Sequence, residues 1–263
     1  MRSDRLMKTS IDINADLGES TESLANGADF ELMRHITSAS IACGGHAGDP
    51  RTMKRTLELT RELGVAAGAH PSYPDFTNFG RVELAIAVDE LEASLRDQIA
   101  ALAHEADKLG VRLNHVKPHG ALYHAANRHH EVALAIGRAV IAMDSKLIVV
   151  GQAGSPCLDL WRSLGLWCAE EAFADRMYER DGALRQRKLP GALLEDPERA
   201  ACQALDIAMR HRVNLDDGSE LPLIAQTLCI HSDTPGAASI ARTVSDRLKA
   251  AGVQIRPMSP AGA

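Results

Sequence analysis

Histidines, carboxylates and a lysine occur together in six short runs of this sequence. The runs are residues 12–19, 42–50, 68–75, 116–120, 171–176 and 231–236. Most of them also contain glycine or proline, which are typical of tight turns where the backbone can approach a ligand. Imidazoles and carboxylates transfer protons or bind metals, and lysine and arginine bind anions. The runs therefore indicate a site at which polar side chains carry out the chemistry.

The first run predicts a functional carboxylate at the end of a strand. Alternation along a strand places Asp12, Asn14 and Asp16 on the same side. Carboxylates that face a core need partners, because burying an unpaired charge is costly. We interpret Asp16 as a candidate catalytic group and Asn14 as a candidate substrate contact. Capping of a turn is the alternative for Asp16.

Two histidines follow the next two predicted strands. His46 lies among three glycines where a strand leads into a helix, so it is a candidate metal ligand, acid–base group or substrate contact. A hydrogen-bonded histidine in a glycine turn is the alternative, and Asp49 is expected to cap the helix. His70, a candidate catalytic group, precedes a proline-rich exit that would direct it over the site. The loop at residues 76–81 could act as a lid.

Lys117 and His119 present a cation and an imidazole on either side of Pro118. Both are candidate catalytic groups. Lysine is seldom buried unless it pairs with an acid or binds an anion. Lys117 is therefore expected either to bind phosphate or oxyanion charge or to be the structural partner of a core carboxylate.

The last two runs add candidate substrate contacts. Glu171, Asp175 and Arg176 follow the sixth predicted strand, where an exposed surface of ion pairs is the alternative. His231 closes the seventh strand and is expected to point into the site. No Walker phosphate loop, dinucleotide fingerprint or serine nucleophile elbow occurs in the sequence.

Composition excludes several classes of function. The 263 residues include 29 Lys+Arg and 35 Asp+Glu, a formal net charge of −6, without a basic block, so nucleic acid is not an expected partner. No apolar run reaches the roughly 18–20 residues that span a membrane, and the first residues lack the apolar core of a signal peptide. We expect a cytoplasmic protein without a membrane partner.

The five cysteines show no CxxC spacing and are expected to be buried thiols.

The elements that must position these groups alternate between strands and helices. Seven strands are predicted, at residues 10–14, 38–43, 64–69, 114–117, 147–151, 166–170 and 226–231, and residues 252–257 form either an eighth strand or a tail. Helices are predicted at residues 51–63, 88–109, 131–143, 196–211 and 237–250. Because consecutive parallel strands need a long crossover, this alternation predicts an α/β fold with a parallel sheet.

The positions of the polar groups favour a closed barrel over an open sheet. Nearly every predicted strand ends in a reactive side chain. In a barrel all strand C-termini meet at one mouth, whereas the outer strands of an open sheet lie too far from the switch point. We expect one (β/α)-barrel domain over residues 1–263, with flexible ends at residues 1–9 and 258–263.

The six runs, together with Phe79-Gly80-Arg81, resemble the LamB/YcsF family from about residue 10 to about residue 256. The resemblance implies a deformed, roughly seven-stranded parallel (β/α) barrel similar to those of glycoside hydrolases and carbohydrate deacetylases. The sequence departs from the family pattern at three positions. The family usually has Cys at the position of Ala15, commonly has Phe at that of Gly45, and has Gly at that of Ser232. Ala15 is therefore a poor candidate nucleophile.

The resemblance also implies a reaction. It implies the A subunit of an ATP-hydrolysing 5-oxoprolinase, a hydrolase that opens the cyclic amide of 5-oxo-L-proline to L-glutamate while ATP becomes ADP and phosphate. ATP would be a co-substrate with Mg²⁺, and activity would require partner subunits B and C. A lactam carbonyl is unreactive, so phosphorylation of its oxygen would supply an electrophile and a leaving group before water attacks.

Such a reaction needs cations near the phosphate, a base for water and donors for the oxyanion. We assign the cations near the phosphate to Lys117 and Arg176. The base for water is Asp16 or His70. The donor to the oxyanion is His119 or His231.

Two other functions stay open. A metal-dependent amide or acetyl hydrolase of the carbohydrate-deacetylase type would use Asp16, His46 and His70 as ligands. A non-catalytic scaffold subunit would bind 5-oxoproline at the mouth while its partners carry out the chemistry. Neither the subunit that binds ATP, nor a bound transition metal, nor the oligomeric state follows from the sequence.

Overall fold

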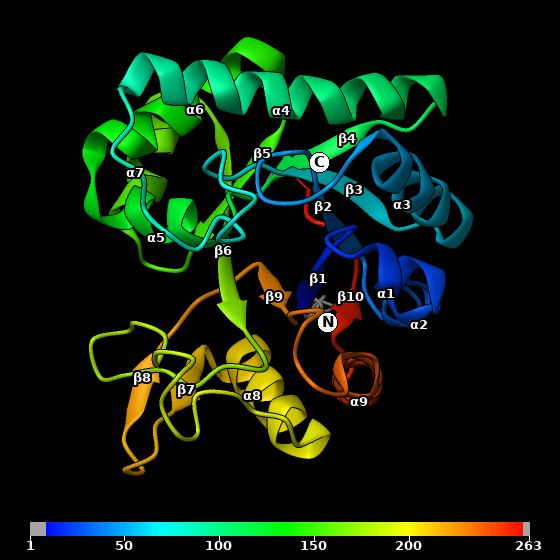
Figure 1. Cartoon of the computed structure of the whole chain (residues 1–263). Coiled ribbons are helices and arrows are strands. Elements are labelled where there is room, and N and C mark those ends of the chain that lie inside the picture. Colours follow the sequence, from blue (N-terminus) through cyan, green and yellow to red (C-terminus); the bar gives the residue numbers. More distant parts are fainter. Residues whose placement is uncertain (1–8, 260–263) are drawn as a thin grey trace, which may run out of the picture.

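Seven parallel strands form a closed barrel at the centre of the protein (Figure 1). The computed structural model describes residues 9–259. Around the barrel the strands are β1 (Ser10–Leu17), β2 (Ser38–Ala42), β3 (Ala66–His70), β4 (Leu113–Val116), β5 (Ile148–Gln152), β6 (Trp167–Phe173) and β9 (Thr227–Cys229). Each neighbouring pair is parallel, and β9 pairs with β1 to close the ring. The predicted seven-stranded parallel (β/α) barrel is confirmed.

The predicted strands are all present, and their ends differ from the prediction by at most three residues. The largest differences are at β1 and β6, which continue to Leu17 and Phe173. The predicted run at residues 252–257 contains the two-residue strand β10 (Gln254–Ile255). This strand pairs in parallel with the start of β1, outside the ring.

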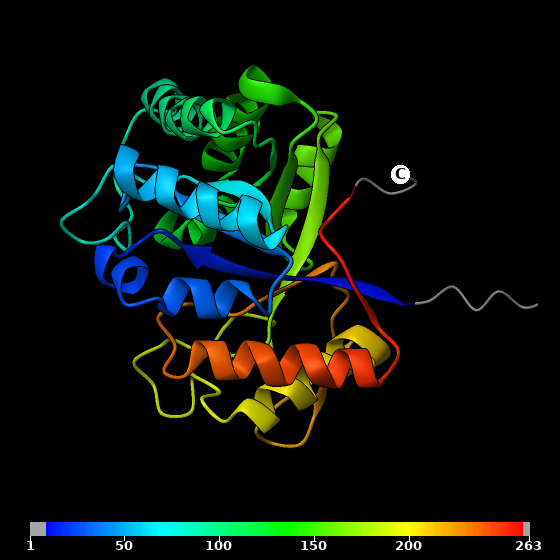
Figure 2. The same ribbon diagram turned by 90° about the vertical axis from the view of Figure 1, so that its right-hand side faces the viewer.

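Helices surround the barrel on its outer side (Figures 1 and 2). They are α1 (Thr21–Ala25), α2 (Ala28–Met33), α3 (Pro50–Leu63), α4 (Val88–Lys108), α5 (Gly120–Arg128), α6 (His130–Asp144), α7 (Pro156–Ser163), α8 (Pro197–Arg210) and α9 (Ala237–Ala250). The five predicted helices correspond to α3, α4, α6, α8 and α9. The side chains of Asp49 and Asp196 cap α3 and α8, as expected. The antiparallel pair β7 (Arg212–Asn214) and β8 (Glu220–Pro222) was not predicted.

The interior of the barrel is polar even where the strands begin. There the buried carboxylate of Asp12 accepts hydrogen bonds from the hydroxyls of Thr37, Ser38 and Thr227, at 2.6, 2.7 and 2.5 Å. Burial raises the pKa of Asp12 to about 6. Met258 packs at this end with a small group of buried apolar side chains from β5 and β6, which are Ile148, Val150 and Ala169.

A glycine in β3 makes room for an imidazole inside the barrel. A Cβ atom on Gly68 would lie 2.3 Å from Nε2 of His115, which comes from β4. The His115 side chain is fully buried and contacts Ser40 Oγ at 3.2 Å. Burial, together with the charges of Lys117 and His70, lowers the pKa of His115 to about 3. The ring is therefore neutral near neutral pH.

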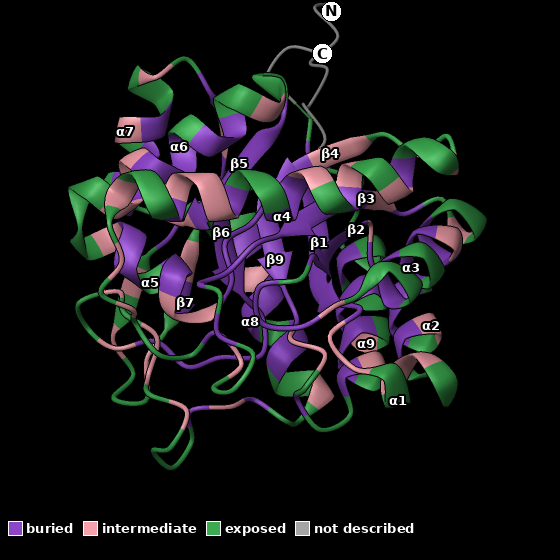
Figure 3. Ribbon diagram, turned by 45° about the horizontal axis from the view of Figure 1, so that its top comes forward, coloured by how far each residue is buried: buried purple, intermediate pink, exposed green. Residues whose placement is uncertain are grey.

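The residues of the barrel strands are mostly buried, whereas the exposed residues lie on the outer faces of the helices and in the loops (Figure 3). The prediction of buried thiols is correct for Cys43, Cys157 and Cys229. It is wrong for Cys202, which lies exposed on the outer face of α8, and Cys168 is only partly buried. None of the helices in the described part of the chain is long and apolar enough to cross a membrane.

The flexible ends predicted at residues 1–9 and 258–263 fall mostly outside the described residues, which run from 9 to 259. Within the described part, Met258 is buried.

Candidate active site

The predicted residues converge at the C-terminal mouth of the barrel, around a cavity of about 850 Å³. Seven of the ten predicted residues line it, namely Asp16, His70, Lys117, His119, Glu171, Arg176 and His231. The other three, Asn14, His46 and Asp175, lie buried behind this lining, in contact with it. The strand ends thus place all ten side chains at one site.

Lys117 lies directly after β4, between two carboxylates. Its Nζ is 2.9 Å from Asp16 Oδ1 and 2.8 Å from Glu171 Oε1. It also donates to Asn14 Oδ1 at 3.0 Å and to Cys229 Sγ at 3.2 Å. Burial opposes the charged ammonium, but its neighbours, Asp16 above all, outweigh this and raise the pKa of Lys117 well above its usual value. Four protein acceptors thus surround an ammonium that has three N–H donors.

Asp16 connects this lysine to a histidine from β3. Its Oδ2 lies 3.4 Å from His70 Nε2. Burial alone would raise the pKa of Asp16, but His70 and Lys117 outweigh burial and hold that pKa well below its usual value. Asp16 in turn raises the pKa of His70 against the effect of burial. Asp16 is therefore ionised at neutral pH.

Glu171, on β6, keeps one carboxylate oxygen free. Asn14 Nδ2 donates to Oε1 of Glu171 at 2.9 Å. Among the described residues, Oε2 has no hydrogen-bond partner of good geometry although it is buried, and the same holds for the hydroxyl of Tyr123 from α5. Both residues line the cavity, and Glu171 adds to burial in raising the pKa of Tyr123, through its charge and through a hydrogen-bond approach of poor geometry between the two side chains. Because buried polar groups normally find partners, these two atoms indicate where a ligand would bind.

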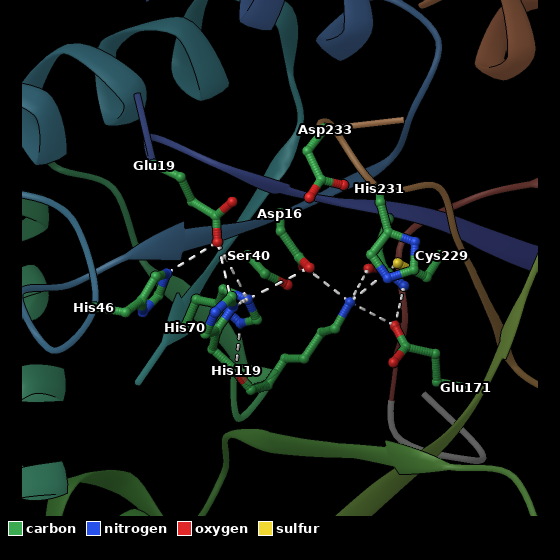
Figure 4. Close-up of polar contacts among 12 residues, drawn as sticks. Asp16, Glu19, Ser40, His46, His70, His119, Glu171, Cys229, His231 and Asp233 are labelled. Atoms are coloured by element: carbon green, nitrogen blue, oxygen red, sulfur yellow. Dashed lines mark hydrogen bonds and ion pairs between the residues drawn. The ribbon is translucent and has the colours of Figure 1, made fainter. Parts of the chain in front are cut away.

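Glu19 gathers three imidazoles on the other side of the mouth (Figure 4). Its Oε1 is 2.9 Å from His46 Nε2, 3.3 Å from His119 Nδ1 and 3.9 Å from His70 Nε2. The rings of His46 and His119 stack with centroids 3.6 Å apart. Burial lowers the pKa of each of these two histidines to about 3, so both rings are neutral. Sequence reasoning missed Glu19, although it lies in the first run.

His231 is oriented by a buried carboxylate. Asp175 Oδ1 lies 3.0 Å from His231 Nδ1, and Asp175 Oδ2 accepts from the backbone N–H of His231 at 3.0 Å and from Thr234 Oγ1 at 2.6 Å. His231 holds the pKa of Asp175 below its usual value even though burial opposes this. Asp175 therefore fixes the position of His231 and does not itself line the cavity.

Arg176 is a buried cation whose partners are neutral. Its side chain donates to Arg185 O at 2.7 Å and to Ala192 O at 3.4 Å. Within residues 9–259 no carboxylate lies within ion-pair distance of it, and only 6% of Arg176 is exposed. Burial and the nearby Arg187 lower the pKa of Arg176. The alternative of an exposed ion-pair surface is wrong here, because Glu171, Asp175 and Arg176 are all buried.

The predicted lid at residues 76–81 is attached to the mouth by its backbone and one side chain. Phe79 O contacts His119 Nε2 at 3.0 Å, and Gly80 O accepts from the N–H of Ala121 at 2.9 Å. Arg81 forms an ion pair of 2.8 Å with Asp233, which also pairs with Arg187 at 2.7 Å. The loop thus covers the histidines from one side.

Comparisons with known proteins agree with this architecture. A protein from Chloroflexus aggregans, named as the A subunit of 5-oxoprolinase, is 50% identical over 247 residues, which are 94% of this chain and 98% of the relative. The crystal structure of a lactam utilization protein from Thermus thermophilus is 42% identical, with a TM-score of 0.89, covering 95% of this chain and 100% of the other.

A family 4 carbohydrate esterase from Streptomyces lividans shares the fold alone, at 10% identity and a TM-score of 0.50 over 97% of this chain and 95% of the other. The profile of the LamB/YcsF family matches residues 11–263. The chain therefore belongs to the LamB/YcsF family, and the resemblance seen in the sequence is confirmed.

Proposed function

We propose that this chain is the A subunit of an ATP-dependent 5-oxoprolinase. In this proposal it binds 5-oxo-L-proline at the barrel mouth and, with subunits B and C, opens the lactam to L-glutamate while ATP is hydrolysed to ADP and phosphate. The names of its relatives, which refer to 5-oxoprolinase and to lactam utilization, support the proposal.

The observation that carries the proposal is the environment of Arg176. A buried guanidinium without a carboxylate partner among the described residues, in a polar cavity, is suited to bind an anion. 5-Oxo-L-proline carries one carboxylate at neutral pH. Binding this carboxylate would supply the partner that Arg176 lacks.

The free oxygens nearby match the lactam. In the proposal, Glu171 Oε2 accepts the lactam N–H and the hydroxyl of Tyr123 donates to the lactam oxygen. A small apolar ring would then lie against the aromatic side chain of Phe173, which also lines the cavity. Each of the three polar groups of the substrate has a candidate partner.

The activation step needs cations near the transferred phosphate. The donors of Lys117 are occupied, so we assign it to holding Asp16 and Glu171 ionised. Arg176 is taken up by the substrate carboxylate in this proposal, so the charge of the phosphate is assigned to Lys188 at the rim of the cavity, together with Mg²⁺ bound to ATP.

Water needs a base, and the developing oxyanion needs a donor. Asp16 is ionised and lines the cavity, so we assign it as the base. His231 is favoured over His119 as the donor, because both ring nitrogens of His119 face protein acceptors.

Steady-state kinetics of the complex reconstituted with subunits B and C test the proposal. Arg176→Gln should raise the KM for 5-oxoproline on the order of 100-fold, since an ion pair to a buried cation is lost. Arg180→Gln is the matched control, because Arg180 is exposed and already paired with Asp217. An unchanged KM in Arg176→Gln, or no 5-oxoproline-dependent phosphate release from the complex, would contradict the proposal.

A further inference from the structure

Backbone carbonyls fix the tautomers of two histidines at the mouth. His70 Nδ1 lies 2.6 Å from Lys117 O, and His119 Nε2 lies 3.0 Å from Phe79 O. A carbonyl oxygen can only accept, so these two ring nitrogens carry the hydrogens. In neutral rings the opposite nitrogens, Nε2 of His70 and Nδ1 of His119, then carry lone pairs.

These two lone pairs face each other and a carboxylate. His70 Nε2 and His119 Nδ1 are only 3.0 Å apart, and Glu19 Oε1 lies 3.3 Å from the second of them. Three acceptors thus converge without a donor between them. Such an arrangement is repulsive unless a cation lies among the three atoms.

We propose that Glu19, His70 and His119 bind a divalent transition-metal ion of the zinc class at the barrel mouth. The side chains of these residues offer atoms that lie within 4.8 Å of one another, and tetrahedral zinc places its ligand atoms about 3.4 Å apart. Two imidazoles select such metals over Mg²⁺ or Ca²⁺. The carbonyl contacts to the outer ring nitrogens are those that orient metal-binding histidines.

His46 supports the site without binding the ion. Its ring is stacked on that of His119 at an interplanar angle of 5°, so one ion cannot lie in both ring planes. His46 Nε2–H instead donates to Glu19 Oε1 and holds the carboxylate in place. Glu19, His70 and His119 all line the cavity, whereas His46 does not. The ion therefore keeps an open position toward the cavity, as hydrolytic metal sites do.

This set replaces the ligands Asp16, His46 and His70 that the sequence suggested. Asp16 is paired with Lys117, and His46 is directed at Glu19. A proton shared between His70 and His119 is the competing explanation, because Asp16 raises the pKa of His70. The inference does not depend on the identity of the substrate.

Metal binding by the full chain decides between the two. Chelator-treated protein is titrated with Co²⁺, and the visible absorption of the bound ion measures binding. Mass spectrometry after dialysis gives the metal content, and Zn²⁺ is then added to displace the Co²⁺. We expect one ion per chain and a higher Tm with Zn²⁺. His119→Gln should weaken binding at least 100-fold and abolish the Tm increase.

Two further variants keep the test informative. His124→Gln is the matched control, because His124 lines the same cavity outside the cluster and should bind metal like the wild type. Glu19→Gln replaces the carboxylate by an amide of nearly the same shape and should also lose metal binding. This variant tests the proposal even if His119→Gln does not fold. No binding by the wild type, or equal binding by all variants, would overturn the proposal and favour the shared proton.

Discussion

At the scale of single residues, the charge of Lys117 holds two buried carboxylates in place. Lys117→Met leaves Asp16 and Glu171 without their cation, so the free energy of unfolding should fall by roughly 3–5 kcal/mol. Urea unfolding measures this. Lys108→Met is the control, because Lys108 is exposed and pairs with the neighbouring Glu105 at the protein surface.

The double variant Lys117→Met/Glu171→Gln should recover part of that loss, because one of the uncompensated charges is removed. A Lys117→Met protein of normal stability that has lost turnover would instead return Lys117 to phosphate or oxyanion binding.

Asp12 should make stability depend on pH. Its pKa in the folded protein, about 6, exceeds the reference value of 3.8, so the folded state holds an extra proton between these values. The contribution of Asp12 to the free energy of unfolding is therefore fully present below pH 3.8 and is lost as the pH rises through about 6. Asp12→Asn has a side chain that stays neutral at every pH, so the stability of this variant relative to wild type should rise by about 2 kcal/mol between pH 4 and pH 7. A pH-independent difference in urea unfolding would contradict this.

The sequence located the site residues that follow from strand alternation and missed the others. Asp16 and His70 could be predicted because parallel strands end at one mouth. Glu19 lies past the end of β1, beyond a turn at Gly18 with a φ of 71°, and alternation does not indicate the direction of a side chain after a turn. Tyr123 lies on α5, a helix that the sequence pattern did not reveal.

At the scale of elements, Gly68 on β3 leaves room for the His115 side chain of the neighbouring strand β4. Gly68→Ala would place a Cβ 2.3 Å from the His115 ring inside a closed barrel and should cost roughly 1–3 kcal/mol. Gly68→Ala/His115→Ser should cost less than the sum of the single variants, since the ring is then absent. Thermal and urea unfolding of the four proteins measure the coupling. Strictly additive losses would show that the contact is not the cause.

The barrel strands and long helices were predictable, while the short elements were not. The long α4 has a repeating apolar stripe and α3 has an aspartate–proline start, and both signals are local. Helices α1 and α2 have five and six residues, too few for a helical period to repeat twice. The strands β7 and β8 are joined by a hairpin turn at residues 215–219, where Gly218 has a φ of 80°. The Asp217-Gly218 pair is a local hairpin signal, but strands of three residues are too short to show an alternating pattern.

At the scale of the whole molecule, we expect the isolated chain to have little or no 5-oxoprolinase activity. The sequence has no Walker loop or dinucleotide fingerprint, and the proposed function requires subunits B and C. Glutamate formation from 5-oxoproline and ATP should appear only after all three are mixed. Robust turnover by the chain alone would show that the mouth contains the complete machinery and would also exclude a scaffold role.

The ion and hydrogen-bond network inside the mouth has a consequence for the rate at which the barrel opens. Asn14 contacts Lys117, Glu171 and Thr227, which are 103, 157 and 213 residues away along the chain. Loop closure has to precede contacts of such high sequence separation, so we expect them to form late and to contribute little to the folding transition state. Asn14→Ala should consequently speed unfolding while leaving the refolding rate nearly unchanged. The polar network beneath the mouth would then also set how long a folded barrel survives.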